Sequence, residues 1–354
     1  MAKMKAFVMK EIGTVAMMEK DVPLDPGPNE AVVRTTRALI CTSDVHTVAG
    51  GIGPRENLTL GHEAVGLVEK LGSEVRGFRR GDRVAVNAIT PDFTCHNCQR
   101  GYPSQCGEML GGWKFANTMD GVFAERFLVN RASANLTHIP DDLPDEKAVY
   151  ACDMMSTGLA GAENADIPVG GTVAVFAQGP VGLMATAGAR LLGAGRIITV
   201  ESVPNRIELS RQYGADDVVN FKETDPVEAI MDLTGGTGVD SAIESLGAQE
   251  TFEACVKVTR PGGTISNVGY YGKGEYVKIP RVEWGVGMGD KTIRTALCPG
   301  GSERMERLFR LMRRGRVDPT PMTTHEFDFE DIEKAFHMMK TKEDDIIKPL
   351  IQFL

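Results

Sequence analysis

The chain has 354 residues, of which 42% are hydrophobic and 25% charged, and its formal net charge is −9. A chain of this length usually builds more than one hydrophobic core, so two domains are expected. The acidic balance argues against a nucleic-acid partner, which requires a basic surface, and against binding to an anionic membrane.

The N-terminal stretch MAKMKAFVMKEIG lacks the long apolar run of a signal peptide and is typical of a first strand. No window approaches eighteen consecutive apolar residues, so the sequence predicts no membrane-spanning helix. We therefore expect a cytoplasmic protein. The first ~150 residues are rich in glycine and proline, with short β-type runs such as EAVVRTT and DRVAVNA, which predicts a mostly-β unit.

Two stretches of this unit contain candidate metal ligands. CTSDVH holds Cys41, Ser43 and His46, and GHEAVGLVEKLGSEV holds His62 and Glu63. Cysteine, histidine and carboxylate side chains are the usual ligands of zinc. The second stretch fits the long pattern G-H-E-x2-G-x5-G-x2-V, which makes it a specific signal.

A third stretch, PDFTCHNCQRGYPSQC, contains Cys95, Cys98 and Cys106. Clustered cysteines in a reducing compartment are more often metal ligands than disulfides. Structural zinc is almost always four-coordinate, so three thiolates leave the fourth ligand open. Two alternatives without a metal also remain, a lobe of reduced cysteines and a disulfide.

From about residue 155 the pattern changes. GTVAVFAQGPVGLMATAGARLLGAGRIITVES is an apolar strand, a glycine turn, a helix and a second apolar strand, which predicts a βαβ unit with a parallel sheet. Further such units follow, and after about residue 297 come two amphipathic helices and a final strand, IIKPLIQF. We predict an α/β fold in which a doubly wound domain, 157–297, is inserted between pieces 1–156 and 298–354 of a mostly-β domain.

The glycine turn of this unit is a candidate nucleotide site. The dinucleotide fingerprint is G-x-G-x-x-G, and Ala177 departs from it at the first position. Gly179 would let the backbone approach a pyrophosphate, Gly182 would allow close packing of helix and strand, and Pro180 and Val181 would open the helix whose N-terminus faces the phosphates. The alternative is an ordinary tight turn between a strand and a helix.

An acidic residue follows the second strand of the unit. Glu201 lies twenty-two residues after Gly179, where a carboxylate can accept hydrogen bonds from the adenosine ribose and repel a 2′-phosphate. Ser202 and Val203 come next, with no arginine in the run. We expect NAD rather than NADP, with Ser202 and Arg206 also near the cofactor. The alternative for Glu201 is a solvated charge at a strand end.

Together these motifs resemble the zinc-dependent medium-chain alcohol dehydrogenases over the whole chain, and within them the tetrameric bacterial secondary-alcohol dehydrogenases. The shared stretches are CTSDVHTV, LGHEAVG, RGDRVAV, GGWKFAN, DMMSTG, GPVGLMA and LCPGG. The resemblance implies a GroES-like catalytic domain with an inserted Rossmann domain. It also implies a homotetramer that takes a small-molecule alcohol or ketone, with no nucleic-acid or membrane partner.

The resemblance also implies a catalytic zinc held by Cys41, His62 and the residue three before STG, which is Asp153. The neighbouring Cys152 is interpreted as a buried small hydrophobe. Glu63 is expected either as an exchangeable fourth ligand or as a charge near the metal. Three protein ligands leave one coordination position open, as in catalytic zinc sites.

Two further residues carry the expected proton transfer. Zinc would act as a Lewis acid on the substrate oxygen, and the nicotinamide would take the hydride. The resemblance implies that Ser43 accepts the alcohol proton and that His46 passes it to solvent, for which an imidazole is suited. The alternatives are a turn hydroxyl for Ser43 and a surface histidine for His46.

The substrate pocket and the cysteine lobe depend on the register of the resemblance. The positions that align with substrate-lining residues, or lie near them, are Ala88, Ile89, Trp113, Tyr270 and Leu297, and each could equally belong to a core. In the cysteine lobe this register puts Asp92 at the position where the family has the first of its four cysteines, and His96 is the competing ligand. The expected structural zinc ligands are therefore Asp92, Cys95, Cys98 and Cys106.

The interpretation is an NAD-dependent zinc enzyme that interconverts secondary alcohols and ketones, or primary alcohols and aldehydes. The alternatives are a polyol or aldehyde dehydrogenase of the same family and a zinc-dependent structural or binding protein. A zinc-free reductase of the same fold would lack the ligands.

Overall fold

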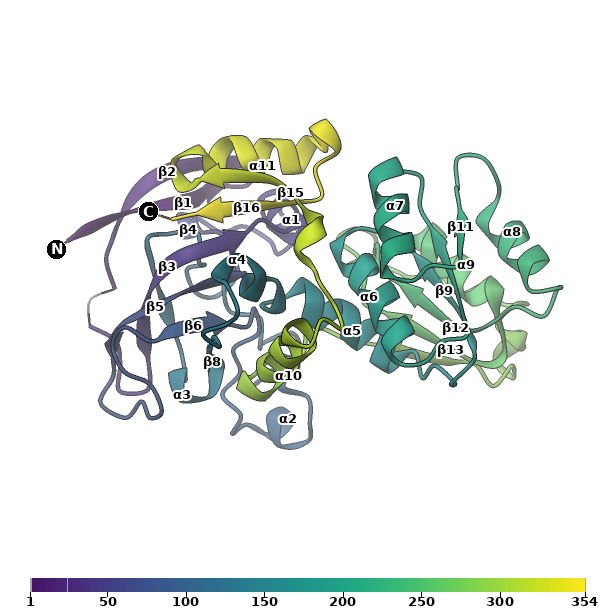
Figure 1. Cartoon of the computed structure of the whole chain (residues 1–354), viewed down its shortest axis with the longest axis horizontal. Helices are drawn as coiled ribbons and strands as arrows, with labels where there is room; N and C mark the ends of the chain where they lie inside the picture. The colour runs from purple at the N-terminus through teal and green to yellow at the C-terminus, as the bar shows by residue number, and fades with distance from the viewer. Residues whose placement is uncertain (1, 24, 354) are drawn as a thin grey trace. The chain divides into compact units, whose positions relative to one another are not determined.

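The computed structural model describes residues 2–23 and 25–353. The chain forms two compact units, one made of Met1–Ser156 with Cys298–Leu354 and the other of Thr157–Leu297 (Figure 1). The predicted fold class, a mostly-β unit together with a doubly wound parallel sheet, is confirmed. None of the helices in the described part of the chain has the length and apolar character needed to span a bilayer.

The first unit is built on two sheets. The larger has the order β15-β16-β3-β5-β6-β8, with β7 paired to β3, and the smaller has the order β2-β1-β4. The strands are β1 Lys3–Glu11, β2 Thr14–Asp21, β3 Ala31–Leu39, β4 Leu58–Thr59, β5 Ala64–Leu71, β6 Arg83–Val86, β7 Arg126–Val129, β8 Leu136–His138, β15 Thr323–Asp328 and β16 Lys348–Gln352. The helices are α1 Thr42–Val48, α2 His96–Gln99, α3 Ala132–Asn135, α4 Asp145–Ala148, α10 Ser302–Arg313 and α11 Ile332–Thr341.

The C-terminal piece of the chain completes the core of this unit. Strand β16 lies between β15, to which it is parallel, and β3, to which it is antiparallel. Helix α11 contributes Phe336 to the same buried cluster as Phe7 of β1 and Ile351 of β16. Residues more than 300 positions apart therefore share one core.

The second unit is one parallel sheet with the order β11-β10-β9-β12-β13-β14. The strands are β9 Thr172–Phe176, β10 Arg196–Val200, β11 Asp217–Val219, β12 Val239–Glu244, β13 Thr259–Asn267 and β14 Thr292–Thr295, with helices α6 Pro180–Leu191, α7 Pro204–Tyr213, α8 Pro226–Leu233 and α9 Gln249–Val258. Helix α5, Met154–Asn164, starts at the end of the first unit and continues into the second. The predicted βαβ unit is β9–α6–β10.

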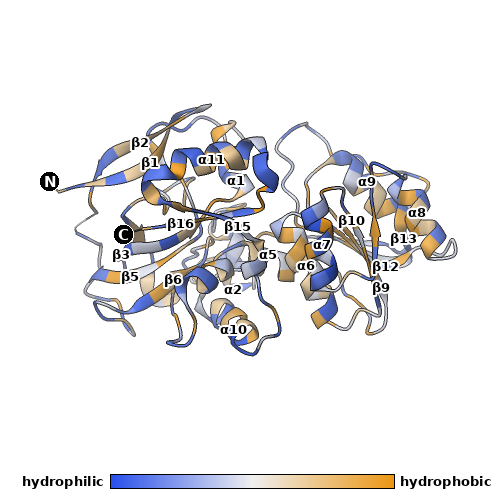
Figure 2. Cartoon of the chain, turned by 45° about the horizontal axis from the view of Figure 1, so that its top comes forward, coloured by the Kyte–Doolittle hydropathy of each residue, from blue (hydrophilic) through white to orange (hydrophobic). Residues whose placement is uncertain are grey.

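The strand sequences explain this sheet. Strands buried on both faces are apolar almost throughout. β9 (TVAVF) and β10 (RIITV) are buried after their first residue, and Figure 2 shows hydrophobic colours along the strands of this sheet. The strand order reverses between β9 and β12. Ligands of open α/β sheets bind outside the carboxyl ends of the strands at such a reversal. The glycine turn after β9 and Glu201 after β10 both lie at that edge.

Candidate active site and metal centres

Four potential ligands converge in the first unit. The ligand atoms of Cys41, His62, Glu63 and Asp153 all lie within 4.8 Å of one another. Cys41 precedes α1, His62 and Glu63 precede β5, and Asp153 precedes α5. The three ligands expected from the resemblance are therefore brought together, with Glu63 beside them. One thiolate, one imidazole and carboxylates form a donor set that suits Zn²⁺.

Cys152, the neighbour of Asp153, lies outside this group. Its side chain is fully buried and its Sγ donates to the carbonyl oxygen of Ala64 at 3.3 Å. Burial raises the pKa of the Cys152 thiol well above its ordinary value, which disfavours the thiolate that a metal requires. The structure thus supports the interpretation of Cys152 as a small buried residue.

Two neighbours orient His62. Gly61 has φ of +88°, and a Cβ there would lie 2.3 Å from the Phe123 ring, so the chain needs glycine before the histidine. The buried carboxylate of Asp44 lies 3.1 Å from His62 Nδ1 and accepts the backbone N–H of Cys41 at 2.9 Å. Such a carboxylate fixes the ring so that Nε2 is directed toward a metal.

The electrostatics of His62 favour a positive charge in the cluster. Burial lowers the pKa of His62, but the carboxylates of Asp44 and Asp153 more than offset it, so the pKa stands well above its ordinary value. His62 Nε2 lies 3.3 Å from Asp153 Oδ2. A divalent cation would satisfy the same anionic surroundings without the proton, since a metal ligand must be a neutral imidazole.

Glu63 is paired with a buried lysine. Lys348 Nζ of β16 lies 2.6 Å from Glu63 Oε2, and both side chains are fully buried. Burial raises the pKa of Glu63 to about 7, and the positive charge of Lys348 limits the rise. Lys348 thus provides an alternative partner for Glu63 beside the other ligands, an arrangement suited to the exchangeable role expected for Glu63.

The two expected proton carriers lie on α1. Ser43 Oγ is 3.3 Å from His62 Nε2, so Ser43 belongs to the cluster, whereas His46 is exposed. Residues three apart on a helix are neighbours on its surface. The structure therefore places a half-buried hydroxyl and an exposed imidazole on one helix.

The cysteine lobe forms a second group. Ligand atoms of Asp92, Cys95, Cys98 and Cys106 lie within 4.8 Å of one another, and the group does not include His96, which is exposed. The backbone N–H groups of Cys95 and Thr94 donate to Asp92 Oδ1 at 2.9 and 2.7 Å, which hold the pKa of that carboxyl below its usual range. Three thiols and an ionised carboxylate fit a closed, four-coordinate zinc site.

The expected substrate-lining residues fall in both units. Ile89 and Trp113 pair through an isolated β-bridge, and the N–H of Ala88 donates to the carbonyl of Cys152 at 2.8 Å. These three therefore lie along the segment next to Asp153, although Ala88 and Ile89 are 3% and 1% exposed and also pack as core. Tyr270 and Leu297 belong to the second unit, and their lining role stays a prediction.

In the second unit the two glycines of the turn differ in their surroundings. A Cβ on Gly179 would meet nothing within 4 Å, whereas a Cβ on Gly182 would lie 2.0 Å from the carbonyl oxygen of Ala177. Gly179 therefore leaves open space at the start of α6, and Gly182 allows close packing. Ala177 has φ of +69°, a left-handed conformation that explains why glycine is usual at this position.

Glu201 is buried and accepts several backbone hydrogen bonds, which the sequence did not indicate. It is 4% exposed, its Oε1 accepts the N–H groups of Ser202 and Val203 at 2.8 and 3.1 Å, and its Oε2 accepts that of Gln178 at 3.0 Å. Acceptor capacity remains on Oε2 for a ribose hydroxyl. Arg206 Nη1 lies 3.8 Å from Oε2, so the lack of arginine in the run 201–203 does not leave the site without a cation.

The comparisons with known proteins agree with this geometry. A family model for the alcohol dehydrogenase GroES-like domain matches residues 27–141, and one for zinc-binding dehydrogenases matches residues 180–314. An NADP-dependent isopropanol dehydrogenase of Thermoanaerobacter brockii is 54% identical over 98% of this chain and 99% of that protein. The chain belongs to the zinc-dependent medium-chain alcohol dehydrogenases.

Other members of this alcohol dehydrogenase family support the assignment. An alcohol dehydrogenase of Cupriavidus necator is 47% identical over 99% of both chains. The solved alcohol dehydrogenase TADH of Thermus sp. ATN1 has a TM-score of 0.88 and 29% identity, over 99% of this chain and 100% of that one. The chain is therefore an enzyme that interconverts alcohols and carbonyl compounds, and the predicted resemblance is confirmed.

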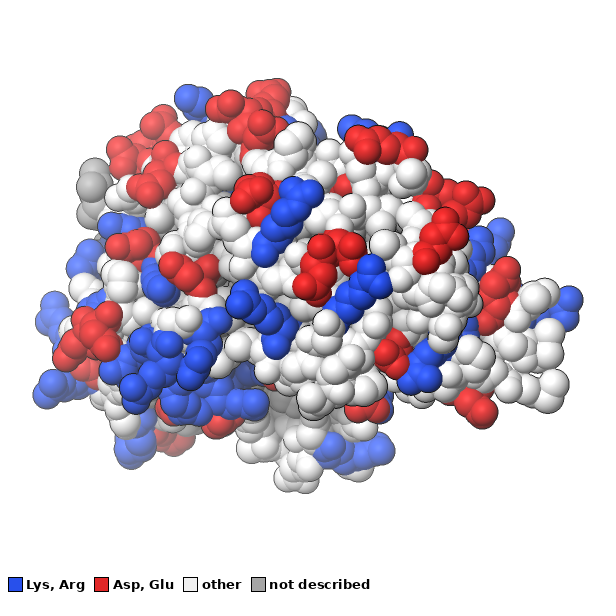
Figure 3. Space-filling view, turned by 45° about the vertical axis from the view of Figure 1, so that its right-hand side comes forward, with Lys and Arg blue, Asp and Glu red and all other residues white. Residues whose placement is uncertain are grey.

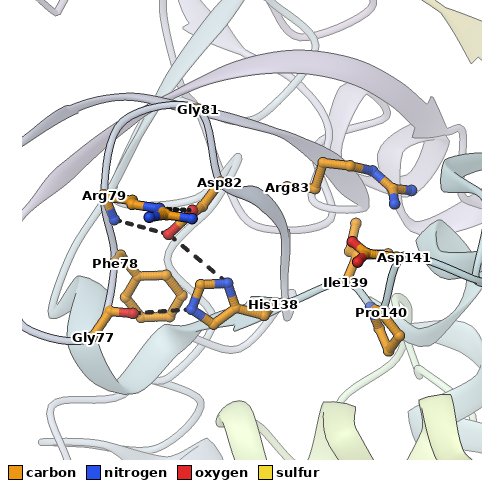
Figure 4. A pocket seen from close by; sticks show the side chains of 10 residues that line it. All are labelled: Gly77, Phe78, Arg79, Gly81, Asp82, Arg83, His138, Ile139, Pro140 and Asp141. Atoms are coloured by element: carbon orange, nitrogen blue, oxygen red, sulfur yellow. Dashed lines mark hydrogen bonds and ion pairs between the residues drawn. The ribbon is translucent and has the colours of Figure 1, made fainter.

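Another cavity of the first unit, of about 820 Å³, lies around His138 (Figure 4). His138 Nε2 lies 2.9 Å from the carbonyl oxygen of Gly77, and its ring stacks on Phe78. Arg79 pairs with Asp82 at 3.3 Å on the same rim. His138, Arg79 and Asp82 interact with one another and with the Gly77 carbonyl, and Arg83 pairs with Asp145 outside the cavity, so we interpret the cavity as loop packing.

Sequence reasoning missed two residues of the metal region, Asp44 and Lys348. Each had a sequence signal. Asp44 lies between two expected functional residues in CTSDVH, and Lys348 interrupts the apolar run IIKPLIQF. A charged residue inside a strand that is otherwise buried requires a buried partner.

Proposed function

We propose that this alcohol dehydrogenase interconverts secondary alcohols and ketones with NAD as its cofactor. The observation that carries the reaction is the convergence of Cys41, His62 and Asp153 within 4.8 Å, with Ser43 Oγ 3.3 Å from His62 Nε2. The relative named as an isopropanol dehydrogenase, at 54% identity, supports a secondary alcohol as substrate.

The chain's own residues divide the work as follows. Cys41, His62 and Asp153 would hold zinc, which when bound polarises the substrate oxygen as a Lewis acid. Ser43 accepts the alcohol proton within the cluster, and His46, exposed on the same helix, exchanges it with water. The dinucleotide, when bound, supplies the hydride acceptor.

The proposed preference for NAD rests on Glu201. Several relatives are named as NADP-dependent, among them the Thermoanaerobacter brockii protein. What supports NAD in this chain is a buried carboxylate at the end of β10, where a 2′-phosphate would meet a like charge. Arg206 weakens that repulsion, but its positive charge is already paired with Glu201, 3.8 Å away.

The test is reduction of NAD and NADP by 2-propanol, measured before and after removal of metal by a strong chelator and again after Zn²⁺ is returned. We expect turnover that depends on zinc and is faster with NAD. Undiminished turnover in protein shown by analysis to be metal-free would refute the metal-dependent mechanism. A panel of secondary, primary and polyhydric alcohols separates the proposed substrate class from its rivals.

We extend the proposal to a structural zinc on Asp92, Cys95, Cys98 and Cys106 and to a cytoplasmic homotetramer. The four converging ligands support the zinc.

The net charge of −9 supports the absence of a nucleic-acid partner. Acidic side chains are interspersed with basic ones on the face in Figure 3, although basic side chains gather in one region of it. Metal content per chain and the mass in solution test these statements.

A further inference from the structure

Arg304 is a buried arginine of α10 that contacts the turn next to a metal ligand. It is 7% exposed, whereas Arg310 and Arg313 of the same helix are exposed. Its Nε donates to Ser156 Oγ at 3.0 Å, and its Nη2 donates to the carbonyl oxygen of Ser156 at 2.8 Å. A buried guanidinium is costly unless it is hydrogen-bonded, so these two bonds fix where α10 meets Ser156.

Ser156 lies in the first turn of α5, three residues after Asp153. It is fully buried, and its Oγ donates to the carbonyl oxygen of Pro299 at 3.0 Å. The Sγ of Cys298 lies 3.8 Å from the carbonyl oxygen of Asp153. The segment from Cys298 to Arg304 therefore holds the turn 153–156 at both of its ends.

The other side of this turn is tied to the start of β5, which follows His62, and to the segment after its neighbour β6. The N–H of Ala88 donates to the carbonyl of Cys152 at 2.8 Å, and Cys152 Sγ donates to the carbonyl of Ala64 at 3.3 Å. Ala64 is the second residue after His62. Cys152, on one side of Asp153, is therefore bonded to the chain that follows His62, and Ser156, on the other side, is bonded to α10.

The position of a carboxylate ligand depends closely on its backbone. Zinc–oxygen distances vary by only about 0.2 Å between sites, and an aspartate has just two side-chain torsions with which to correct a displaced main chain. We propose that Arg304 is a positioning residue for the metal site. Acting through Ser156, it holds the turn that places Asp153 Oδ2 beside His62 Nε2, 3.3 Å away.

This inference rests on the proposed metal site, but it concerns binding of the metal rather than the reaction. The test is the zinc affinity of the full-length protein, measured by competition with a chelator in wild type, Arg304→Met and Arg304→Lys. The site is identified as the one whose binding is lost in Asp153→Ala. We expect about tenfold weaker zinc binding in Arg304→Met, the lower end for groups that support metal ligands.

Arg304→Lys should recover part of the loss, because an ammonium can donate to one of the two acceptors. The zinc of the cysteine lobe should be unchanged in both variants. If Arg304→Met does not fold, Ser156→Ala is the substitute, since it removes the Oγ acceptor and leaves the main-chain one. It should weaken zinc binding in the same direction by a smaller factor.

Two control variants on α10 separate positioning from stability. Arg313→Met removes only a surface ion pair with Asp142, 2.8 Å long, and should leave zinc affinity unchanged. Met312→Ala makes a cavity at a residue that is 2% exposed and should lower the melting temperature without weakening zinc. Wild-type affinity in both Arg304 variants, or equal weakening by Met312→Ala at equal loss of stability, overturns the proposal.

The same measurements distinguish failure of this inference from failure of the proposed function. Zinc binding at the site without alcohol turnover by either cofactor would refute the function and leave the effect of Arg304 intact. Turnover of 2-propanol with unchanged zinc affinity in the variants would refute only the role of Arg304. A wild-type protein that binds no zinc at Cys41, His62 and Asp153 would overturn both.

Discussion

Replacing Glu201 with glutamine isolates the charge that we expect to choose the cofactor. Glutamine keeps the length of the side chain and one carbonyl oxygen, so it can preserve the bonds from the N–H groups of Ser202 and Val203 at 2.8 and 3.1 Å. It removes the negative charge beside Gln178, where the second strand meets the glycine turn. The amide nitrogen that replaces Oε2 cannot accept the N–H of Gln178, so the variant should also lose some stability, and the ratio of the two cofactors reports the effect of the charge.

The size of the effect follows from the charges at this edge of the sheet. Two unit charges about 5 Å apart interact by roughly 3 kcal/mol at an effective dielectric constant of about 20. A 2′-phosphate carries a charge of about −1.5 to −2, which gives roughly 4.5–6 kcal/mol of repulsion from Glu201, and we take Arg206, 3.8 Å from Glu201, to offset about half of it. We expect NAD to be favoured by about 2–3 kcal/mol, or roughly 30- to 150-fold in kcat/KM.

The assay is kcat/KM for each cofactor at saturating 2-propanol, in wild type and Glu201→Gln. In the variant, the ratio of kcat/KM with NAD to kcat/KM with NADP should fall at least about tenfold, mainly because kcat/KM with NADP rises. Glu208→Gln is the matched control, because it makes the same change at an exposed position of the neighbouring helix α7. Equal use of both cofactors by the wild type, or an unchanged ratio in Glu201→Gln, would refute the reasoning.

Three further predictions follow from the site geometry. Gly179→Ala should fold normally, because its Cβ would meet no protein atom, and should weaken dinucleotide binding, because the Cβ would enter the space expected for the pyrophosphate. Gly182→Ala should cost about 1–3 kcal/mol of stability, because its Cβ would lie 2.0 Å from a main-chain oxygen. Thermal melts and cofactor titrations of both variants check this. Asp153→Ala should keep the fold and lose turnover while Cys152→Ala stays active, and the reverse result in alcohol assays would show that the ligand is misassigned. Asp92→Ala should reduce zinc from about two ions per chain to about one and lower the melting temperature, so metal analysis that still finds two ions would contradict the closed lobe.

Local sequence patterns were sufficient to predict the parallel sheet of the second unit. The apolar runs that form β9 and β10 and the glycine turn between them are patterns of a few residues each, so they predict structure without knowledge of the rest of the chain. The departure at Ala177 was also visible, but only its φ of +69° shows how the chain tolerates a side chain there. Glu201 was placed correctly at the strand end, while its three backbone donors and Arg206 were not foreseen.

The metal region depended on information of another kind. The candidates Cys41, His62 and Asp153 came from motifs and from resemblance, and spacing alone could not show that residues more than 100 positions apart meet. Asp44, Lys348 and Arg304 were missed for a related reason. From sequence alone a charged side chain is expected at the surface unless its buried partner is known. The partner of Lys348 is Glu63 and that of Arg304 is Ser156, and both are distant in sequence.

The sequence by itself thus determined the α/β fold class, the parallel sheet of the second unit, the family and the identities of the candidate donor atoms. Each of these depends on residue type and on short periodic patterns that water and backbone sterics select locally. Only the tertiary structure decided which charges are buried and what they face, because Lys348 pairs with Glu63 across the junction of β16 with β3, and Arg304 reaches Ser156 from α10. Those pairings arise when strands and helices far apart in the chain close one core, and burial then requires each charge to find its partner.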